Sequence, residues 1–336
     1  MHAVVLVGGF GTRLRPLTEH IPKPMLPVGH VPMIERLIQR LERGGVTCVV
    51  LALGFKPEPF VDAFPDGRCG DVELVYAVEP EPLDTGGAIR FAADEAGIDS
   101  TFVVANGDVI TDLDVAALVT AHRDAAAAAT IHLIGVDDPS AYGVVDFHET
   151  APGVGRIEQF VEKPAPGTEP SNLINAGTYV FEPSVLGHIP SGERVSIERS
   201  TFPLLVEAGS IYGFATDDYW IDAGVPDLYR AANLDLLGDG RTHDACEAIA
   251  ADATVDPGAT VTNTIVGSGA MIEAGTTVVD SVILPGAFVG ARAQVESSLV
   301  MGRVEADATV IESIIGADGV VPAGDHLAFD SVPAAE

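Results

Sequence analysis

Few cysteines and no long apolar run occur in this sequence, and each shortage excludes a class of protein. Cys48, Cys69 and Cys246 are the only cysteines in 336 residues, and no two of them have CxxC spacing. Such a set argues against a disulfide framework or a zinc site and is typical of a reducing cytosol. The sequence also has no run of about 18 or more apolar residues, the length that a membrane-spanning helix needs. We therefore expect a cytoplasmic protein with no membrane partner.

Basic residues are also scarce. Lys and Arg total 18 against 49 Asp and Glu, which gives a formal net charge of -31. A nucleic-acid-binding protein needs a basic face, so we expect no nucleic-acid partner. The chain has three lysines, Lys23, Lys56 and Lys163, and two of them lie in the segments "PKP" and "EKP". Because the chain otherwise avoids lysine, these two ammonium groups are candidates for chemistry.

The first two thirds of the chain have the pattern of an α/β domain. A length of 336 residues, 47% of them hydrophobic, suggests two globular domains. Up to about residue 110, apolar strand-like runs (3–7, 46–53, 71–78, 101–108) alternate with helical patterns. This alternation predicts a Rossmann-like, doubly wound sheet, and strand-like runs from 130 to 222 extend it into a mixed sheet. Ligands bind at the carboxyl ends of such strands, so we expect Asp108 and the loop after the first strand at one edge.

After residue 248 the pattern changes to a six-residue repeat. The tetrads "NTIV", "DSVI", "SSLV" and "ESII" begin at 263, 280, 297 and 312, with spacings of 17, 17 and 15. A six-residue period is typical of a parallel β-helix, here with its last coil contracted by two residues. We expect an α/β domain over 1–237, a linker over 238–248 and a β-helix over 249–330. Apolar residues recur through the repeat in steps of six, six and five, at Ile249, Val255, Val261, Val266, Ile272, Val278, Ile283, Val289 and Val295.

A glycine-rich loop follows the first strand, in "LVGGFGTRLRPLTEHIPKPMLPVG" (6–29). It is neither a Walker loop nor a GxGxxG fingerprint, which argues against a P-loop NTPase and a dinucleotide oxidoreductase. Backbone N–H groups of such a loop can cradle phosphate oxygens, and the Arg13 guanidinium can bind two of them at once. Lys23 lies between two prolines just beyond. The loop therefore predicts a polyphosphate site.

Several motifs together resemble those of sugar-nucleotide pyrophosphorylases, the nucleoside-triphosphate:sugar-1-phosphate nucleotidyltransferases. They are "GGFGTRLRPLT…PKPMLPV", "NGD" (106–108), "YGVV" (142–145), "VEKP" (161–164), "INAGTYVF" (174–181) and "YWIDAG" (219–224). The resemblance covers nearly all of residues 1–237 and extends to a C-terminal left-handed β-helix, which several branches of the family carry. "EPLDTGGA" and "SIERSTFP" are most similar to the mannose-1-phosphate guanylyltransferase branch. That branch usually reads "EPLGTAG", whereas this chain has Asp84 and Gly86.

The resemblance implies a reaction without a protein nucleophile. A sugar 1-phosphate oxygen attacks the α-phosphorus of a nucleoside triphosphate in line, and pyrophosphate leaves. Because the attacking oxygen is already anionic, catalysis depends on positioning and charge neutralisation. GTP and mannose 1-phosphate are the expected substrates; dTTP or UTP with glucose 1-phosphate remains open.

Residue roles also follow from the resemblance. Arg13, Lys23, Asp108, Lys163 and Asp222 would be catalytic. Lys23 would stabilise the α-phosphate and the departing pyrophosphate, and Asp108 and Asp222 would hold Mg²⁺. The triphosphate, ribose and base would contact Gly8, Gly9, Gly11, Thr12, Arg13, Glu79, Thr85 and Gly86. The sugar phosphate would contact Gly143, Glu162, Lys163, Asn175 and Gly177.

Glu79 is the candidate for base selection. A carboxylate can accept hydrogen bonds from both N1–H and the exocyclic amine of guanine, whereas thymine and uracil offer one N–H. The alternative is that Glu79 is a solvated loop residue.

Two other functions would fit parts of this sequence. A hexapeptide acyltransferase needs a histidine base in the coils, which offer only His326 near their end. A non-catalytic, nucleotide-sugar-sensing regulatory subunit is disfavoured because Arg13, Lys23, Asp108 and the other expected catalytic residues are present. We expect the β-helix to mediate assembly into a homo-oligomer.

Overall fold

The computed structural model describes the chain except for residues 10, 55–56, 239–241, 243 and 335–336. Its contacts divide the chain into two compact units, each described here by itself. The first unit consists of residues 1–9, 35–107 and 111–220, and the second of residues 10–34, 108–110 and 221–336. Part of the linker expected over 238–248 lies outside the described residues.

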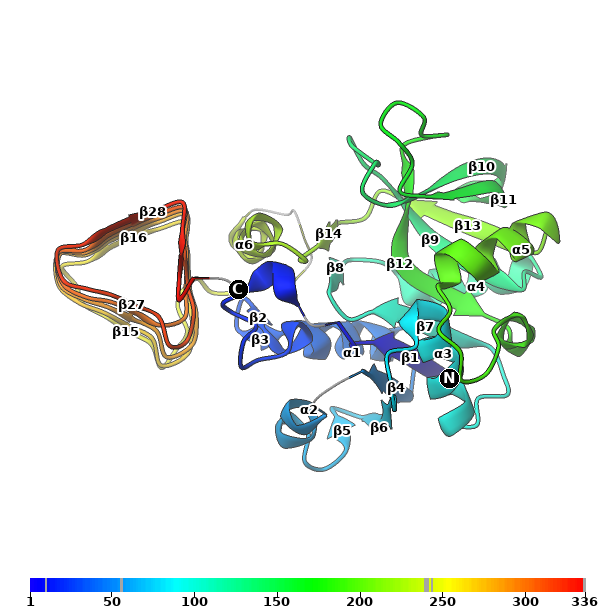
Figure 1. The fold of residues 1–336 in the computed structure, drawn as a ribbon, viewed down its shortest axis with the longest axis horizontal. Coiled ribbons are helices and arrows are strands. Elements are labelled where there is room, and N and C mark those ends of the chain that lie inside the picture. The colour runs from blue at the N-terminus through cyan, green and yellow to red at the C-terminus, as the bar shows by residue number, and fades with distance from the viewer. Residues whose placement is uncertain (10, 55–56, 239–241, 243, 335–336) are drawn as a thin grey trace. The chain divides into compact units, whose positions relative to one another are not determined.

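The first unit is built on one mixed sheet of ten strands, as the alternating pattern predicted (Figure 1). The strand order is β10-β11-β13-β9-β12-β7-β1-β4-β6-β5. β7, β1, β4 and β6 are mutually parallel, while β12 runs antiparallel to both β7 and β9. The strands are β1 (His2–Leu6), β4 (Cys48–Leu53), β5 (Arg68–Cys69), β6 (Val72–Val78), β7 (Phe102–Asn106), β9 (Ala129–Gly135), β10 (Gly143–Ala151), β11 (Val154–Glu162), β12 (Leu173–Phe181) and β13 (Ile211–Thr216).

The central strands are apolar along their whole length because they are buried on both faces. β4 reads CVVLAL, and every residue after Cys48 is buried. Such continuous runs are typical of parallel strands covered on both sides. Val4, Val50, Val104 and Ile131 belong to the core that forms over this sheet.

Helices flank the sheet and fill the connections between its strands. In α1, Leu37, Ile38 and Leu41 follow the spacing of one helical face and are buried. No helix among the described residues is long and apolar enough to cross a membrane. The α-helices are α1 (Met33–Arg43), α2 (Glu58–Ala63), α3 (Asp84–Glu95), α4 (Val115–Asp124), α5 (Phe202–Glu207) and α6 (Pro226–Leu234). Short 3-10 helices are η1 (Thr12–Leu14), η2 (Lys23–Met25), η3 (Pro183–His188) and η5 (Asp235–Leu237), and η4 (Ile197–Thr201) is a π-helix.

Two short pairs of strands complete the part before the repeat. β2 (Pro27–Val28) pairs with β3 (Val31–Pro32), and β8 (Val109–Thr111) pairs with β14 (Trp220–Asp222). The second pair matters for function, because Asp108 immediately precedes β8 and Asp222 ends β14.

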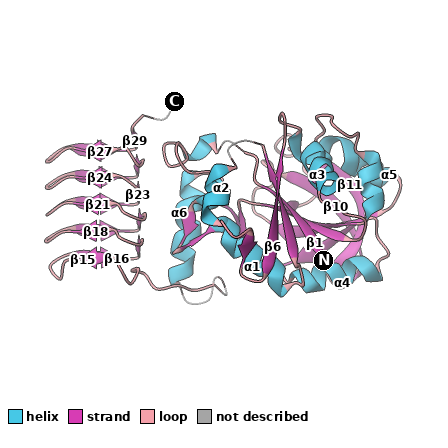
Figure 2. Ribbon diagram, turned by 90° about the horizontal axis from the view of Figure 1, so that it is seen from below, coloured by secondary structure: helices cyan, strands magenta, loops and turns pink. Residues whose placement is uncertain are grey.

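The second unit contains the left-handed parallel β-helix that the six-residue repeat and the family resemblance predicted. Its coils superimpose as a triangle in Figure 1 and stack in Figure 2. The first face consists of β15 (Thr254–Val255), β18 (Met271–Ile272), β21 (Phe288–Val289), β24 (Arg303–Val304) and β27 (Val320–Val321). The second face consists of β16 (Thr260–Thr262), β19 (Thr277–Val279), β22 (Gln294–Glu296), β25 (Thr309–Ile311) and β28 (His326–Ala328). The third face consists of β17 (Ile265–Val266), β20 (Val282–Ile283), β23 (Leu299–Val300), β26 (Ile314–Ile315) and β29 (Ser331–Val332).

One detail of the repeat was predicted wrongly: the contracted coil is not the last one. On the third face Ile265 pairs with Val282, Val282 with Leu299, Leu299 with Ile314, and Ile314 with Ser331. The spacing therefore returns to 17 after the short step of 15. The tetrad pattern missed this additional coil because a polar Ser331 stands where the other coils have Ile, Val or Leu.

The missing two residues belong to the corner between β23 and β24. Met301 and Gly302 alone span this corner, whereas four residues link β20 to β21. A Cβ added at Gly302 would lie 2.4 Å from the carbonyl oxygen of Gly316 and 2.3 Å from that of Gly319. The tighter corner therefore requires glycine.

Candidate active site

The glycine loop leads into a short helix that exposes Thr12 and Arg13. Gly11 has a φ of 60°, in the left-handed region that favours glycine, and caps η1. Leu14 is fully buried and anchors η1, while Thr12 and Arg13 are exposed. Gly8 and Gly9 belong to the first unit, whereas residues 11–34 belong to the second.

Lys23 holds a buried ammonium group between two carboxylates. Its side chain is only 8% exposed, and its Nζ donates to Asp108 Oδ2 at 2.5 Å. The same Nζ lies 3.7 Å from Asp222 Oδ1. A charge buried this deeply needs charged partners, which the two aspartates supply. Three residues that the sequence singled out from separate segments are thus neighbours within the second unit.

Gly224 lets these charged groups come close together. A Cβ added there would lie 2.7 Å from Asp222 Oδ1, 2.9 Å from Arg13 Nη2 and 3.1 Å from Lys23 Nζ. The Ala223 N–H donates to the Asp108 carbonyl oxygen at 3.2 Å, which ties the two aspartate segments together. Arg13 therefore reaches the same point as Lys23 and Asp222.

The Asp222 carboxylate is suited to a cation. Burial raises its pKa, as does the Asp108 carboxylate, and the charges of Lys23 and Arg13 oppose the increase. Its Oδ1 is buried and has no hydrogen-bond partner among the described residues. Two neighbouring carboxylates, one of them with a buried oxygen that has no hydrogen-bond partner, fit a divalent metal ion, which takes oxygen ligands.

In the first unit, Glu79 is a buried residue rather than a solvated one. It is 8% exposed, and its Oε2 accepts a hydrogen bond from the Leu83 N–H at 2.9 Å. Burial raises the pKa of the Glu79 carboxyl, and the hydrogen bond opposes this. The solvated alternative is therefore wrong, and one carboxylate oxygen already has a backbone donor.

Thr85 and Gly86, at the start of α3, form hydrogen bonds with residues 195–198. Thr85 Oγ1 donates to Glu198 Oε2 at 2.8 Å and accepts from the Ile197 N–H at 2.9 Å. The Gly86 N–H donates to the Val195 carbonyl oxygen at 2.7 Å, and an added Cβ would lie 3.0 Å from that oxygen. Both residues thus have packing contacts.

Asp84 is one of the two departures from the branch motif, and the backbone conformation at this position explains why glycine is usual there. Its φ is 62°, a left-handed conformation that glycine adopts freely and that Asp tolerates better than most residues. Asp84 Oδ1 accepts a hydrogen bond from the Thr85 N–H at 2.9 Å. The substitution therefore keeps the backbone turn.

Glu162, Lys163 and Gly143 lie together where β10 and β11 pair. Gly143 is directly opposite Glu162, and an added Cβ would lie 3.0 Å from Glu162 Oε2. Lys163 has a φ of 51° and its N–H donates to the Tyr142 carbonyl oxygen at 2.9 Å. Strained left-handed residues other than glycine are often found at functional sites. The Lys163 Nζ is 3.9 Å from Glu162 Oε1, on a side chain that is 60% exposed.

The Glu162 carboxylate has a perturbed environment. Burial raises its pKa, and so does the charge of Glu198, while Lys163 and Arg199 act in the opposite direction. The Glu198 carboxylate also accepts the hydrogen bond from Thr85. The expected sugar-contacting group and the α3 segment are therefore linked through Glu198.

Asn175 and Gly177 lie in an irregular part of β12, where the register shifts. Asn175 Oδ1 accepts from the Gly177 N–H at 3.0 Å, and its Nδ2 donates to the Tyr179 hydroxyl at 2.9 Å. Gly177 has a φ of 78°, and an added Cβ would lie 2.6 Å from Asn106 Nδ2. This glycine lets the Asn106 side chain approach the strand closely.

Three residues with site contacts received no role from the sequence. Asn106, Glu198 and Gly224 all lie within motifs that carried the resemblance, "NGD", "SIERSTFP" and "YWIDAG". The signal was present, but only the coordinates relate Asn106 to Gly177, Glu198 to Thr85, and Gly224 to the aspartate pair.

Two family models match the chain. One, described as nucleotidyl transferase, matches residues 2–238, and the other, described as GlmU-like C-terminal hexapeptide, matches residues 232–325. The first corresponds to the segment that carries the expected site residues and the second to the β-helix.

Known proteins with similar sequences or structures agree with these matches. The chain is 40% identical to a mannose-1-phosphate guanylyltransferase of Mycobacterium tuberculosis, over 80% of this chain and 75% of that one. The structure of HddC from Yersinia pseudotuberculosis complexed with GMP-PN has a TM-score of 0.58 and 31% identity, covering 69% of this chain and 97% of that one. A putative glucose-1-phosphate thymidylyltransferase from Bacillus anthracis, in complex with a sucrose, has a TM-score of 0.63 and 26% identity, covering 69% and 94%.

Proposed function

Because the chain belongs to the nucleotidyl transferase family, we propose that it transfers a guanylyl group from GTP to mannose 1-phosphate. The products would be GDP-mannose and pyrophosphate. The choice of GTP and mannose 1-phosphate rests on the similarity to the mycobacterial guanylyltransferase, whose name states that activity.

The observation that carries the proposal is the buried ammonium of Lys23 between Asp108 and Asp222, with Arg13 beside them. The fold does not need such a cluster of charges for its own stability. It is suited to a reaction in which negative charge moves from an α-phosphate to a leaving pyrophosphate.

The bond changes need no protein nucleophile. A phosphate oxygen of mannose 1-phosphate forms a bond to the α-phosphorus, and the bond from that phosphorus to the bridging oxygen breaks. Pyrophosphate leaves with the electron pair. Lys23 would stabilise the oxygens that gain charge, and Arg13 would bind the β- and γ-phosphates beside the backbone N–H groups of Gly11 and Thr12.

Asp108 and Asp222 would hold Mg²⁺, since two carboxylates, one of them with a buried oxygen that has no hydrogen-bond partner, match the ligands that this ion takes. When bound, the ion supplies charge neutralisation at the phosphates. Lys23 would then share its aspartate partners with the ion and remain free to face the α-phosphate.

The first unit would bind the sugar phosphate. Lys163, which is mostly exposed, would neutralise the phosphate of mannose 1-phosphate. Glu162 and Asn175 would accept or donate hydrogen bonds to sugar hydroxyls. Gly143 and Gly177 leave space where a side chain would collide with Glu162 or Asn106.

Base selection is assigned to Glu79, with Gly8 and Gly9 completing the loop at the triphosphate. One carboxylate oxygen of Glu79 is held by Leu83, which fixes the orientation of the other. That oxygen would accept a hydrogen bond from guanine. Thr85 and Gly86 would support the ribose and base from the start of α3 through the contacts with residues 195–198.

We also propose the domain limits and the setting. Residues 1–237 would form the catalytic domain, 238–248 the linker and 249–330 the β-helix, through which the chain would form a homo-oligomer. Among the described residues Cys48, Cys69 and Cys246 form no disulfide, and burial raises the pKa of the Cys69 thiol to about 11, as suits a structural thiol in the cytoplasm.

The test is pyrophosphate release with Mg²⁺, crossing GTP, dTTP, UTP and ATP with mannose 1-phosphate and glucose 1-phosphate. Because the surface is so acidic, the assay is run at low and at molar salt. We expect a dominant signal from GTP with mannose 1-phosphate that is lost in Asp108→Asn. Silence with every pair from a folded protein would favour a regulatory subunit instead.

A second candidate is the same reaction with dTTP or UTP and glucose 1-phosphate. The similarity to a putative glucose-1-phosphate thymidylyltransferase favours it. A dominant signal from one of these pairs would keep the mechanism and correct the substrates.

A further inference from the structure

Gly316 lies at a corner of the β-helix where one other coil also has glycine, Gly267, and two coils have larger residues. Gly316 follows a third-face strand, and Leu284 and Met301 occupy the same position in two other coils. All three donate their N–H to a carbonyl oxygen of the next coil, and none has a positive φ. This corner therefore accepts large side chains elsewhere, so its backbone does not require glycine at 316.

Pro16 explains the glycine. A Cβ added at Gly316 would lie 2.7 Å from Pro16 Cβ, 2.9 Å from its Cγ and 3.1 Å from its carbonyl oxygen. These are the nearest atoms that such a Cβ would meet. The segment behind the glycine loop thus packs directly on this corner of the β-helix, and a side chain at 316 would push it away.

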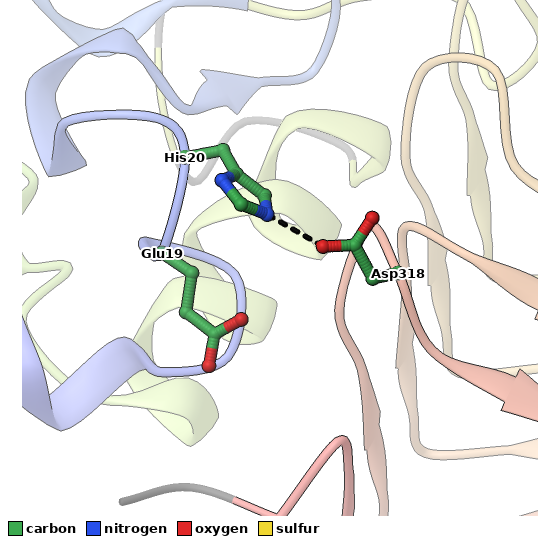
Figure 3. A group of neighbouring side chains, drawn as sticks. All are labelled: Glu19, His20 and Asp318. Carbon is green, nitrogen blue, oxygen red and sulfur yellow. Dashed lines mark hydrogen bonds and ion pairs between the residues drawn. The ribbon is translucent and has the colours of Figure 1, made fainter.

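A second contact joins the same two segments two residues further along. His20 Nε2 and Asp318 Oδ2 are 2.6 Å apart, on side chains that are 60% and 71% exposed (Figure 3). Glu19 lies beside them. One carboxylate oxygen of Glu19, one of Asp318 and a ring nitrogen of His20 all lie within 4.8 Å of one another. An exposed pair contributes little to stability, and this one is a second link between the segment that carries His20 and the corner at Asp318.

The segment from Pro16 to His20 is coupled in turn to the phosphate site. Thr18 Oγ1 donates to the Gly11 carbonyl oxygen at 2.8 Å. A Cβ added at Gly11 would lie 3.1 Å from Thr18 Cγ2 and 3.2 Å from Lys23 Cβ. Gly11, Thr18 and Lys23 are therefore packed against one another, and a shift of Thr18 would move both the loop and the ammonium group.

We propose that the corner at Gly316–Asp318 is a platform that positions the triphosphate site. Gly316 and Asp318 are positioning residues: they act on Arg13 and Lys23 through Pro16 and His20. This inference rests on the proposed function and extends it, because it gives the β-helix a part in binding the nucleoside triphosphate.

The first experiment replaces Gly316 with Val and measures KM separately for GTP and for mannose 1-phosphate. We expect the KM for GTP to rise about tenfold and kcat to fall, since misplacement by about 1 Å is costly to catalysis. The KM for mannose 1-phosphate should stay within about twofold, as its expected contacts lie in the first unit. Met301→Val also places Val directly after a third-face strand, at the contracted corner of the preceding coil. It is the control and should change neither constant.

A double-mutant cycle tests whether the effect passes through Pro16. Gly316→Ala should raise the KM for GTP in the wild-type background and have no further effect in a Pro16→Gly background, where the overlapping ring is gone. Asp318→Ala should raise the same constant by about twofold and leave the thermal midpoint unchanged, because exposed pairs add little stability.

The outcome that overturns the proposal is a Gly316→Val protein that is merely less stable, with both KM values unchanged or raised equally. Additive effects of Gly316→Ala and Pro16→Gly would overturn it too. Wild-type inactivity with every substrate pair would refute the proposed function instead. The platform would then be measured by calorimetric titration with GTP and Mg²⁺, with weaker binding expected for Gly316→Val and equal binding contradicting it.

Discussion

Replacing Lys23 with Met removes the charge that holds Asp108 and Asp222 together. The Nζ of Lys23 is 3.7 Å from Asp222 Oδ1, and at an effective dielectric constant of about 20 this attraction is about 4 kcal/mol. Removing one member of a buried pair costs about 3–5 kcal/mol. Asp108 and Asp222 are 33% and 24% exposed, so water screens part of this loss. We expect the free energy of unfolding to fall by about 2–3 kcal/mol without metal.

Added Mg²⁺ should recover most of that loss. A divalent ion bound by the two carboxylates replaces the missing positive charge, so it stabilises the variant more than the wild type. At saturating Mg²⁺ the difference should fall below about 1 kcal/mol. The ion does not replace the contact between the Lys23 ammonium and the α-phosphate, so kcat should still be lower by about a hundredfold or more.

Urea denaturation with and without Mg²⁺ measures both effects. Lys163→Met is the control, because Lys163 is 60% exposed and its removal should change stability by no more than about 0.5 kcal/mol. Equal losses in the two variants, or a Lys23→Met loss that Mg²⁺ does not reduce, would refute the argument that Lys23 neutralises a cation-binding aspartate pair.

Three further predictions concern single residues. His132 is fully buried, and burial lowers its pKa from 6.5 to about 3, so between these values only the unfolded chain takes up a proton. From pH 6.5 to 5 the unfolding free energy of the wild type should therefore fall by about 1.6 kcal/mol more than that of His132→Gln, measured by urea denaturation. Glu79→Gln should lower kcat/KM with GTP about tenfold more than with dTTP, because the amide no longer offers guanine a charged acceptor. Asp222→Asn should raise the Mg²⁺ concentration for half-maximal activity by about tenfold or more, as seen in a metal titration.

Each of these has a contradicting result. Parallel pH profiles for the wild type and His132→Gln would mean that the imidazole is not kept neutral by burial. An equal loss with both nucleotides would remove Glu79 from base selection. An unchanged metal requirement in Asp222→Asn would remove that carboxylate from the metal site.

The repeat was readable from the sequence because each coil needs only its neighbours. From Val255 onward the apolar residues at steps of six, six and five fill the interior, and the phase was correct as far as Ile314. Ile249, the first residue of the predicted series, is exposed instead. The additional coil was not predicted because Ser331 occupies a third-face position where the other coils have apolar residues. The position of the contraction escaped because the corner at Gly302 is defined by carbonyl groups of another coil.

Only the site residues that belong to recognisable motifs could be predicted from the sequence. Lys23, Asp108 and Asp222 were chosen from separate segments, and the structure brings them within hydrogen-bond or ion-pair distance. By contrast, the partners of Glu79 and Thr85 are Leu83 and Glu198, and nothing in a single sequence reveals such pairings.

Glycines were harder still to interpret. Gly224 was part of a quoted motif without a role, and Gly316 resembled any other residue of a Gly-rich repeat. Their importance depends on which atoms would collide with a Cβ, and those atoms come from Arg13 and Pro16, about two hundred and three hundred residues away along the chain.

The most direct test of the central claim follows the α-phosphorus itself. GTP labelled with ³²P at the α-position is incubated with mannose 1-phosphate and Mg²⁺, and the products are separated by chromatography. The account predicts that the label passes into GDP-mannose while an equimolar amount of unlabelled pyrophosphate appears, and that Lys23→Met loses both products together. Label recovered as GDP with inorganic phosphate, or GTP left intact by a folded protein, would contradict it.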